Sequence, residues 1–225
     1  MTDNQELNAD LTQRVVIDTT KIEWQKTDSQ GVWRKPLKLV HDPKRHHETS
    51  LLRFDPGTEL PTEKLTRQTE IFVLEGAISD EHGDYTPKTY LLIPPGERHA
   101  PTSIEGCVIL ITCGRLSAKR QRVVIDVETQ AWEPWGHRGG TRVPLHRDEE
   151  ESEIVYIGNM QPNAHIPDHG HPGGEEIFFL NGSMKDEFDI YRAGTWVHFP
   201  DDFRHSPSSL KDGCMLYVRR HTTFF

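Results

Sequence analysis

Cysteines are few in this sequence, and helical periodicity is missing from it. The 225 residues include three cysteines, Cys107, Cys113 and Cys214, and no two of them form a Cys-x-x-Cys pair. An odd number of widely spaced cysteines fits reduced, buried thiols better than disulfide bonds. No segment of ten or more residues repeats its apolar positions with a 3.6-residue period, which argues against a helical fold.

Long apolar runs and clusters of basic residues are also absent. No stretch approaches the roughly 18 apolar residues of a membrane-spanning helix. The first ten residues carry neither the basic nor the apolar region of a signal peptide. The formal charge of −9 argues against a nucleic-acid surface, because phosphate contacts need clustered Lys and Arg. We therefore expect a cytoplasmic protein with no membrane or nucleic-acid partner.

What the sequence does contain is a series of short apolar runs. Examples are residues 71–74, 90–93 and 108–111, and Gly, Pro, Asp and Asn separate such runs along the chain. This spacing is typical of antiparallel strands in a sandwich or barrel. The predicted fold class is all-β.

The chain is also an internal duplication. The hexapeptide Gln-Arg-Val-Val-Ile-Asp at residues 13–18 recurs at residues 121–126, and residues 70–72 match residues 176–178. The repeat length is about 107 residues, which predicts two domains of the same fold. We expect a flexible N-terminus at residues 1–12, a first domain at residues 13–117 and a second domain at residues 118–225.

A cluster of metal-binding residue types lies in the second copy. His169 and His171 are two residues apart, so in a strand both imidazoles project from the same face. Residues 172–174, Pro-Gly-Gly, cannot continue a strand, and the chain returns there as a new strand led by Glu175. His205 follows a third predicted strand. These four residues predict one divalent metal site, and Zn, Fe, Ni, Cu and Mn all suit three imidazoles and a carboxylate.

The sequence also offers candidates for the surroundings of this predicted site. Glu176 competes with Glu175, but Glu176 has a counterpart, Glu70, in the first copy and is expected on the opposite strand face. Phe179, Trp196 and Tyr217 are candidates for the pocket above the metal, although the interior of a β-barrel needs such bulk anyway. No catalytic residue is assigned.

The first copy has lost most of these residues. Glu63, Leu65 and Thr69 stand in the places of His169, His171 and Glu175, and only His99 keeps the place of His205. One interpretation is a structural half without a metal. The other is a remodelled site formed by Glu63, Glu70 and His99. We favour the structural half, since Leu and Thr cannot replace an imidazole and a carboxylate.

The two motifs of the second copy resemble the two signature motifs of the cupin superfamily. The first reads Asn163-x5-His169-x-His171-x3-Glu175-x6-Gly182, and the second reads Gly194-x5-Pro200-x-Asp202-x2-His205. Asn163 and Asp202 stand where glycines are usual, and Ser209 stands where an Asn is common. The likeness covers both halves, which implies a bicupin of two tandem jelly-roll barrels. Within the superfamily, the Gly-Gly-Glu-Glu turn and the segment after His205 resemble the ChrR-like cupins.

The resemblance implies that His169, His171, Glu175 and His205 hold a metal, with zinc expected first and iron, nickel or manganese as alternatives. It also implies a sensor or regulatory module of a stress response, with a small-molecule ligand. The founding member of the ChrR group has an N-terminal anti-sigma module with a His-x3-Cys-x2-Cys zinc site. Nothing like that module occurs here, so we do not expect direct sigma-factor binding.

The resemblance leaves a second function open. The ChrR-like group includes acetylacetone-dioxygenase-like proteins, which implies an Fe(II)-dependent dioxygenase acting on a small diketone or enol. A third, weaker alternative is an isomerase or sugar-binding cupin with Glu175 as a base. Because cupins commonly pair through sheet edges, we also expect a homodimer.

Overall fold

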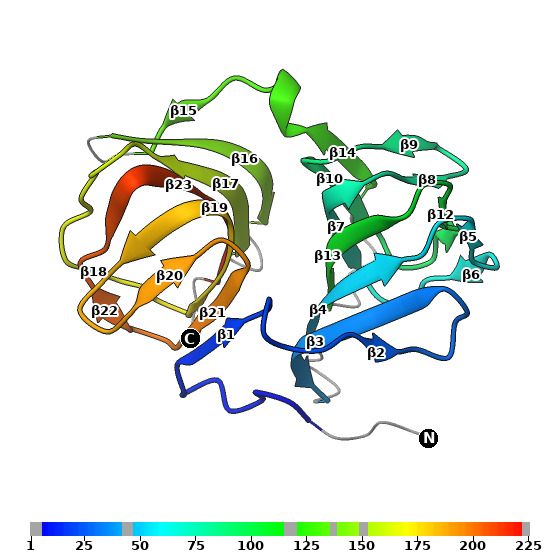
Figure 1. Cartoon of the computed structure of the whole chain (residues 1–225), viewed down its shortest axis with the longest axis horizontal. Helices are drawn as coiled ribbons and strands as arrows, with labels where there is room; N and C mark the ends of the chain where they lie inside the picture. The colour runs from blue at the N-terminus through cyan, green and yellow to red at the C-terminus, as the bar shows by residue number, and fades with distance from the viewer. Residues whose placement is uncertain (1–5, 42–46, 115–120, 136–138, 149–152, 222–225) are drawn as a thin grey trace. The chain divides into compact units, whose positions relative to one another are not determined.

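The computed structural model describes residues 6–41, 47–114, 121–135, 139–148 and 153–221, and these residues form a protein built almost entirely of strands (Figure 1). Their one helical segment is a 3-10 turn, Val127–Thr129. Nowhere in this part of the chain is a helix long and apolar enough to cross a membrane. The predicted all-β fold is confirmed.

The chain divides into two compact units, and the division differs from the expected boundaries. Unit 1 takes residues up to Ala9 and residues 22–129, whereas unit 2 takes residues 10–21 and 130–225. The expected boundary near residue 117 lies outside the described residues. At the expected flexible N-terminus, residues 1–5 are also outside them, but Leu7 forms a β-bridge with Leu39 inside unit 1.

Unit 1 is a barrel made of one large antiparallel sheet and two smaller sheets. Its strands are β2 (Gln25–Lys26), β3 (Val32–Val40), β4 (His47–Phe54), β5 (Thr58–Glu59), β6 (Glu63–Lys64), β7 (Thr69–Gly76), β8 (Ile78–Asp80), β9 (Gly83–Tyr85), β10 (Thr89–Ile93), β11 (Arg98–His99), β12 (Thr102–Ser103), β13 (Cys107–Cys113) and β14 (Val123–Asp126). The sheet orders are β14-β10-β7-β13-β4-β3-β2, β5-β12-β8-β9 and β11-β6.

Unit 2 repeats this plan with longer strands. Its strands are β1 (Val15–Asp18), β15 (Glu133–Pro134), β16 (Gly140–Asp148), β17 (Glu153–Met160), β18 (His169–Gly170), β19 (Glu175–Lys185), β20 (Ile190–Arg192), β21 (Thr195–Phe199), β22 (Arg204–His205) and β23 (Ser208–His221). The large sheet runs β1-β21-β19-β23-β17-β16-β15, with β20 paired to β19, and β18 pairs with β22.

The two identical hexapeptides form the exchanged strands β1 and β14. β1 comes from the first repeat but pairs with β21 in unit 2, where Ile17 lies opposite Trp196. β14 comes from the second repeat but pairs with β10 in unit 1, where Ile125 lies opposite Tyr90. Each repeat therefore supplies an edge strand to the barrel of the other.

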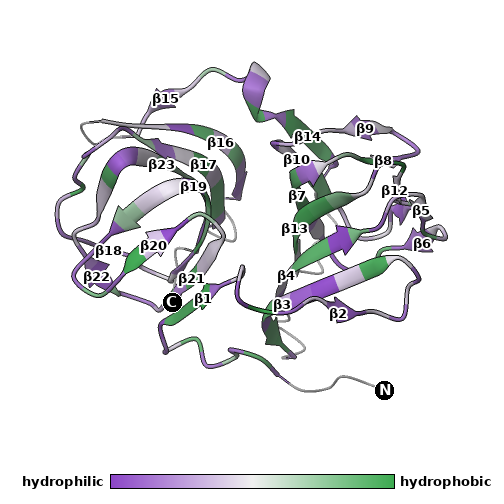
Figure 2. Cartoon of the chain, in the orientation of Figure 1, coloured by the Kyte–Doolittle hydropathy of each residue, from purple (hydrophilic) through white to green (hydrophobic). Residues whose placement is uncertain are grey.

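Each unit has its own apolar core. Alternate residues of the strands face inward, and Figure 2 shows the hydrophobic colouring along β7 and β13 of unit 1. In unit 2 the core cluster includes Ile177, Phe179, Tyr191, Phe199 and Leu216, all at most 4% exposed. Burial of this kind, at about 25 cal/mol per Å² of apolar surface, is the main stabilising contribution to each barrel.

Equivalent glycines close each barrel at the same place. Gly76 has a φ of +68°, and Gly182 has a φ of +66°. A Cβ added to either residue would lie 2.0 Å from the carbonyl oxygen of Gly106 or Gly213, respectively. Only glycine tolerates both the left-handed backbone and this close approach. The close approach therefore explains why the cupin-like motif has a glycine at position 182.

All three cysteines are free, in agreement with the sequence prediction. Cys107 and Cys214 are buried. Burial raises the pKa of Cys214 to about 12, so this thiol stays protonated and unreactive at neutral pH.

Candidate metal centre

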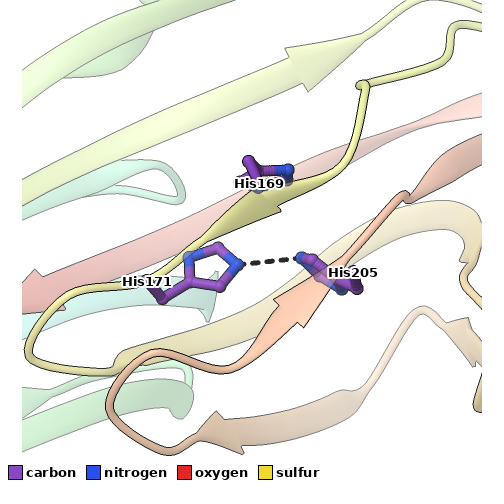
Figure 3. A group of neighbouring side chains, drawn as sticks. All are labelled: His169, His171 and His205. Carbon is purple, nitrogen blue, oxygen red and sulfur yellow. Dashed lines mark hydrogen bonds between the residues drawn. The ribbon is translucent and has the colours of Figure 1, made fainter.

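Three histidines of unit 2 converge on one point (Figure 3). β18 pairs with β22 so that His169 lies opposite His205, and His171 follows directly after β18. The Nε2 atoms of His171 and His205 are 2.9 Å apart. The ligand atoms of all three rings lie within 4.8 Å of one another. The structure therefore brings together the three histidines that the sequence pattern selected.

The turn after His171 explains how the next strand reaches the same place. Gly173 and Gly174 have φ angles of +84° and +81°, which disfavour other residue types. The backbone N–H of Gly173 donates to Oδ1 of Asp201 at 2.7 Å. A Cβ on Gly174 would lie 2.9 Å from the carbonyl oxygen of Phe199. The pair of glycines lets β19 start close behind His171, with Glu175 as its first residue.

Each histidine contacts an acceptor through its Nδ1 atom. His169 Nδ1 lies 2.9 Å from the Pro167 carbonyl oxygen, His171 Nδ1 lies 3.2 Å from Oε2 of Glu175, and His205 Nδ1 lies 2.9 Å from Oδ2 of Asp186. A carbonyl or carboxylate only accepts, so Nδ1 of His169 and of His205 carries the proton. That tautomer leaves the Nε2 lone pair for a metal, and such outer contacts are the usual support of a metal-binding histidine.

Protonation states at neutral pH also suit a metal. Burial lowers the pKa of His169, so its ring is neutral. Burial acts to raise the pKa of Glu175, but His171 and Arg220 outweigh that effect and hold the pKa below its ordinary value. For Asp186, hydrogen bonds from His205 and Tyr191 outweigh burial and lower the pKa to about 2. Neutral imidazoles and ionised carboxylates are the forms that bind or support a cation.

Glu175, the expected fourth ligand, lies beside the three-histidine cluster. Its Oε2 atom contacts Nδ1 of His171, on the far side of that ring from Nε2. In this arrangement the carboxylate orients His171. The next residue, Glu176, is buried and does not line the pocket, consistent with its expected place on the other face of β19.

A cavity of about 50 Å³ opens beside the histidines and can hold a few water-sized groups. Its lining consists of Trp135, Tyr156, Ile166, His169, His171, Glu175, Ile177, Met184, His205, Pro207, Leu216, Val218 and Arg220. The prediction that Phe179, Trp196 and Tyr217 line the pocket is wrong, because within the described residues none of the three reaches it. Phe179 stacks on Tyr191 in the core. Trp196 and Tyr217 lie opposite Phe178, on the reverse face of the sheet.

Behind the site, a chain of hydrogen bonds links His205 to the exchanged N-terminal segment. Tyr191 donates its hydroxyl to Oδ2 of Asp186 at 2.7 Å, and Arg14 Nη2 donates to the Tyr191 oxygen at 2.8 Å. Arg14 also forms an ion pair with Asp189 at 2.7 Å. The sequence analysis missed Asp186, although the duplication contains a signal: Asp80 occupies the equivalent position in the first repeat.

The counterpart region of unit 1 has a different composition. His99 lies opposite Glu63 between β11 and β6, as His205 lies opposite His169. The groups that gather with His99 are Asp80 and Glu81, and Arg122 binds Asp80 at 2.9 Å.

The alternative site of Glu63, Glu70 and His99 does not form. Glu70 accepts hydrogen bonds from Gln68 at 2.7 Å and from Tyr90 at 2.7 Å, and Glu63 is exposed. Leu65, in the place of His171, packs against the apolar core.

Comparison with solved structures supports the fold. A candidate dioxygenase from Nostoc punctiforme PCC 73102 superposes with a TM-score of 0.80 at 19% identity, covering 93% of this chain and 82% of that chain. A candidate glyoxylate-induced protein from Pseudomonas aeruginosa superposes with a TM-score of 0.78 at 13% identity, covering 94% of this chain and 90% of that chain. The oxalate decarboxylase–formate complex from Lactobacillus farciminis gives 0.67 at 11% identity, covering 93% and 86%. At these identities the likeness shows the fold alone.

Comparison at the sequence level identifies the family. No curated protein matches the chain. The model of the ChrR cupin-like domain matches twice in tandem, at residues 12–117 and 120–223, and so covers both repeats. Cupins generally bind a divalent metal, and three converging imidazoles whose Nδ1 atoms each contact an acceptor fit such an ion. The chain belongs to the ChrR cupin-like family, as a bicupin whose second barrel contains a candidate metal site of three histidines.

Proposed function

We propose that unit 2 is a mononuclear metal-dependent dioxygenase acting on a small enolisable substrate. The observation that carries the proposal is the convergence of three imidazoles beside a cavity while Glu175 contacts Nδ1 of His171. Three protein ligands of a six-coordinate ion leave positions for a substrate and O2, whereas a closed tetrahedral zinc site needs a fourth protein ligand.

The spacing of two of the nitrogens suits a shared ion. Two nitrogens bound to one ion are about 3.0 to 3.4 Å apart for bonds of about 2.1 Å. The Nε2 atoms of His171 and His205 are 2.9 Å apart, so small movements of the rings would let one ion bind both.

The residues around the cavity have separable roles in such a reaction. The three histidines would hold the ion, and an iron(II) ion bound there would supply the redox chemistry that activates O2. Glu175 is ionised, lines the cavity and can take a proton from the carbon between two carbonyl groups. Apolar walls, such as Ile177 and Leu216, exclude water. A 1,3-diketone and O2 would give a 2-oxo aldehyde and a carboxylic acid, each product taking one oxygen atom.

The experiment is metal analysis of the purified protein followed by anaerobic iron reconstitution and measurement of O2 uptake with small 1,3-diketones. We expect one iron per chain and O2 uptake that His205→Ala abolishes. Zinc alone on purification, with no O2 uptake after reconstitution, would overturn the proposal. That result would favour a zinc-binding regulatory module, the alternative function that the resemblance to the ChrR-like cupins implies.

A further inference from the structure

Arg220 is a cation inside the metal-centre cavity. It lies on β23 directly opposite Glu175 of β19, and its side chain lines the cavity together with Val218 and Leu216. Arg220 is partly buried, and a partly buried guanidinium is stabilised by a compensating partner, because removing a charge from water is costly. The partners of Arg220 therefore indicate whether it serves the fold or a ligand.

The fold supplies Arg220 with little compensation. Its Nη2 atom donates to the carbonyl oxygen of Gly170 at 3.1 Å, and its Nε atom is buried without a hydrogen bond. No carboxylate of the described residues forms an ion pair with it, and the opposite residue, Glu175, contacts His171 instead. The neighbouring Arg219 differs, since it forms a buried ion pair with Glu153 at 2.5 Å. Arg219 is therefore paired directly, whereas Arg220 faces the cavity and interacts with Glu175 only through its charge.

A second donor lines the same wall. Tyr156 lies on β17 opposite Val218, so its side chain and that of Arg220 share one face of the sheet. Trp135 forms a side-chain hydrogen bond with the Tyr156 hydroxyl, and an indole N–H can only donate. The phenol hydrogen therefore remains available for an acceptor in the cavity.

The duplication separates a structural role from a ligand-binding role. In unit 1 the counterpart of Arg220 is Cys113, because Cys113 lies opposite Thr69 as Arg220 lies opposite Glu175. The counterpart of Tyr156 is Ser50, at the repeat offset of 106. Unit 1 forms the same barrel without either donor. Both donors are absent from unit 1, which also lacks the counterparts of His169 and His171. The barrel fold therefore requires neither donor.

We propose that Arg220, assisted by Tyr156, binds the negatively charged oxygen of the substrate, and that unit 2 accepts small organic anions, as carboxylates or enolates. The inference rests on the proposed function, because a bound metal would take the other oxygen of the same molecule. Charge supports it: with a divalent ion bound, the charges of the ion, Glu175 and Arg220 would sum to +2, and an anion would reduce that charge. The cavity volume of about 50 Å³ favours a small anion.

The test is calorimetric binding of three small probes to the full-length, metal-loaded protein under anaerobic conditions. Pyruvate carries a carboxylate, acetylacetone supplies an enolate, and 2,3-butanedione is a neutral match to pyruvate in size. The variants are Arg220→Gln, Arg220→Lys and Arg192→Gln, the last on the exposed part of β20. Metal content and thermal unfolding are measured on the same samples, so loss of metal or of fold is seen separately.

We expect pyruvate or acetylacetone, whichever anion the cavity takes, to bind more tightly than 2,3-butanedione. Arg220→Gln should weaken that binding about 10- to 100-fold, the effect of one hydrogen bond to a charged group. Arg220→Lys should lie between, and Arg192→Gln should match the wild type. Equal binding of the anion by wild type and Arg220→Gln, tighter binding of the neutral probe, or no binding of any probe would overturn the inference. A full metal complement alongside any of these results would leave the proposed metal site intact.

Discussion

The two barrels share a polar framework and differ in the ligands placed on it. In each unit a histidine contacts a buried aspartate, a tyrosine hydroxyl donates to that aspartate, and an arginine from an exchanged segment donates to the tyrosine. The members are His205, Asp186, Tyr191 and Arg14 in unit 2, and His99, Asp80, Tyr85 and Arg122 in unit 1. The framework therefore belongs to the fold, and the metal ligands are an addition to it.

Arg122 and Arg14 account for part of the difference in charge between the two clusters. In unit 1, Arg122 donates to Asp80 through two nitrogens at 2.9 Å, so the aspartate is neutralised by the protein itself. Burial lowers the pKa of His99, whose ring is neutral beside that ion pair. In unit 2, Arg14 instead pairs with Asp189, and Asp186 is left to support His205. Arg122 therefore supplies the positive charge that a cation would otherwise bring to Asp80.

The largest expected effect comes from breaking the cluster of unit 2. His171→Ala removes the ring whose Nε2 lies 2.9 Å from that of His205, and we expect bound metal to fall from one ion per chain to almost none. The matched control is His99→Ala in unit 1, which should leave metal content unchanged. Elemental analysis after dialysis measures both variants. Full metal content in His171→Ala would show that the ions bind elsewhere.

The opposite change sharpens the comparison. His99 already lies opposite residue 63, as His205 lies opposite residue 169, so the double variant E63H/L65H should place three imidazoles in unit 1. We expect metal content to rise from one toward two ions per chain, with weaker binding at the new site because Arg122 already neutralises Asp80. Introducing His171→Ala as well isolates the new site. Unchanged metal content in E63H/L65H would show that the framework alone does not position the ligands.

The sequence predicted the parts of this comparison that depend on local order. His169, His171 and His205 were found because strand alternation and one Gly-Gly turn decide which way these side chains point. Asn163 and Asp202 occupy glycine positions of the motif, and the structure gives them φ angles of +58° and +55°, which Asn and Asp tolerate. Side-chain direction and backbone conformation of this kind depend on only a few neighbouring residues, so the sequence predicts them.

Contacts between distant segments were not predictable in the same way. Arg14 and Tyr191 are 177 residues apart in sequence, and they meet only because β1 joins the barrel of the other repeat. Both hexapeptides are identical, so their sequence cannot indicate which barrel each completes. Phe179 and Trp196 were wrongly predicted to line the pocket. Strand alternation puts Phe179 in the core and Trp196 on the reverse face, and the size of a side chain does not indicate which face it occupies.

A smaller effect is expected at the aspartates that support the histidines. Asp186→Asn removes the charge that orients His205, and we expect metal affinity to fall about 10- to 100-fold, as is usual for an outer partner of a metal ligand. Asp80→Asn, the matched change in unit 1, should leave metal affinity unchanged. Competition with a chelator of known affinity measures both. Equal effects of the two variants would mean that the aspartates act through stability alone.

The smallest effects on metal affinity are expected at Arg122 and Arg14. Loss of Arg122 should lower the stability of unit 1, whereas loss of Arg14 should slightly lower the metal affinity of unit 2. Arg122→Gln leaves Asp80 buried without its partner, and breaking such a pair costs about 3 to 5 kcal/mol of stability in unit 1 with no change in metal affinity.

Arg14→Gln breaks a pair with the half-exposed Asp189, which costs about 1 kcal/mol or less. It also frees the Tyr191 hydroxyl, which still donates to Asp186, so metal affinity should fall only about twofold to fivefold. Chemical denaturation and chelator competition on the same samples separate the two readouts. A large loss of metal in Arg14→Gln with normal stability would show that the exchanged segment controls the metal site more strongly than its exposed ion pair suggests.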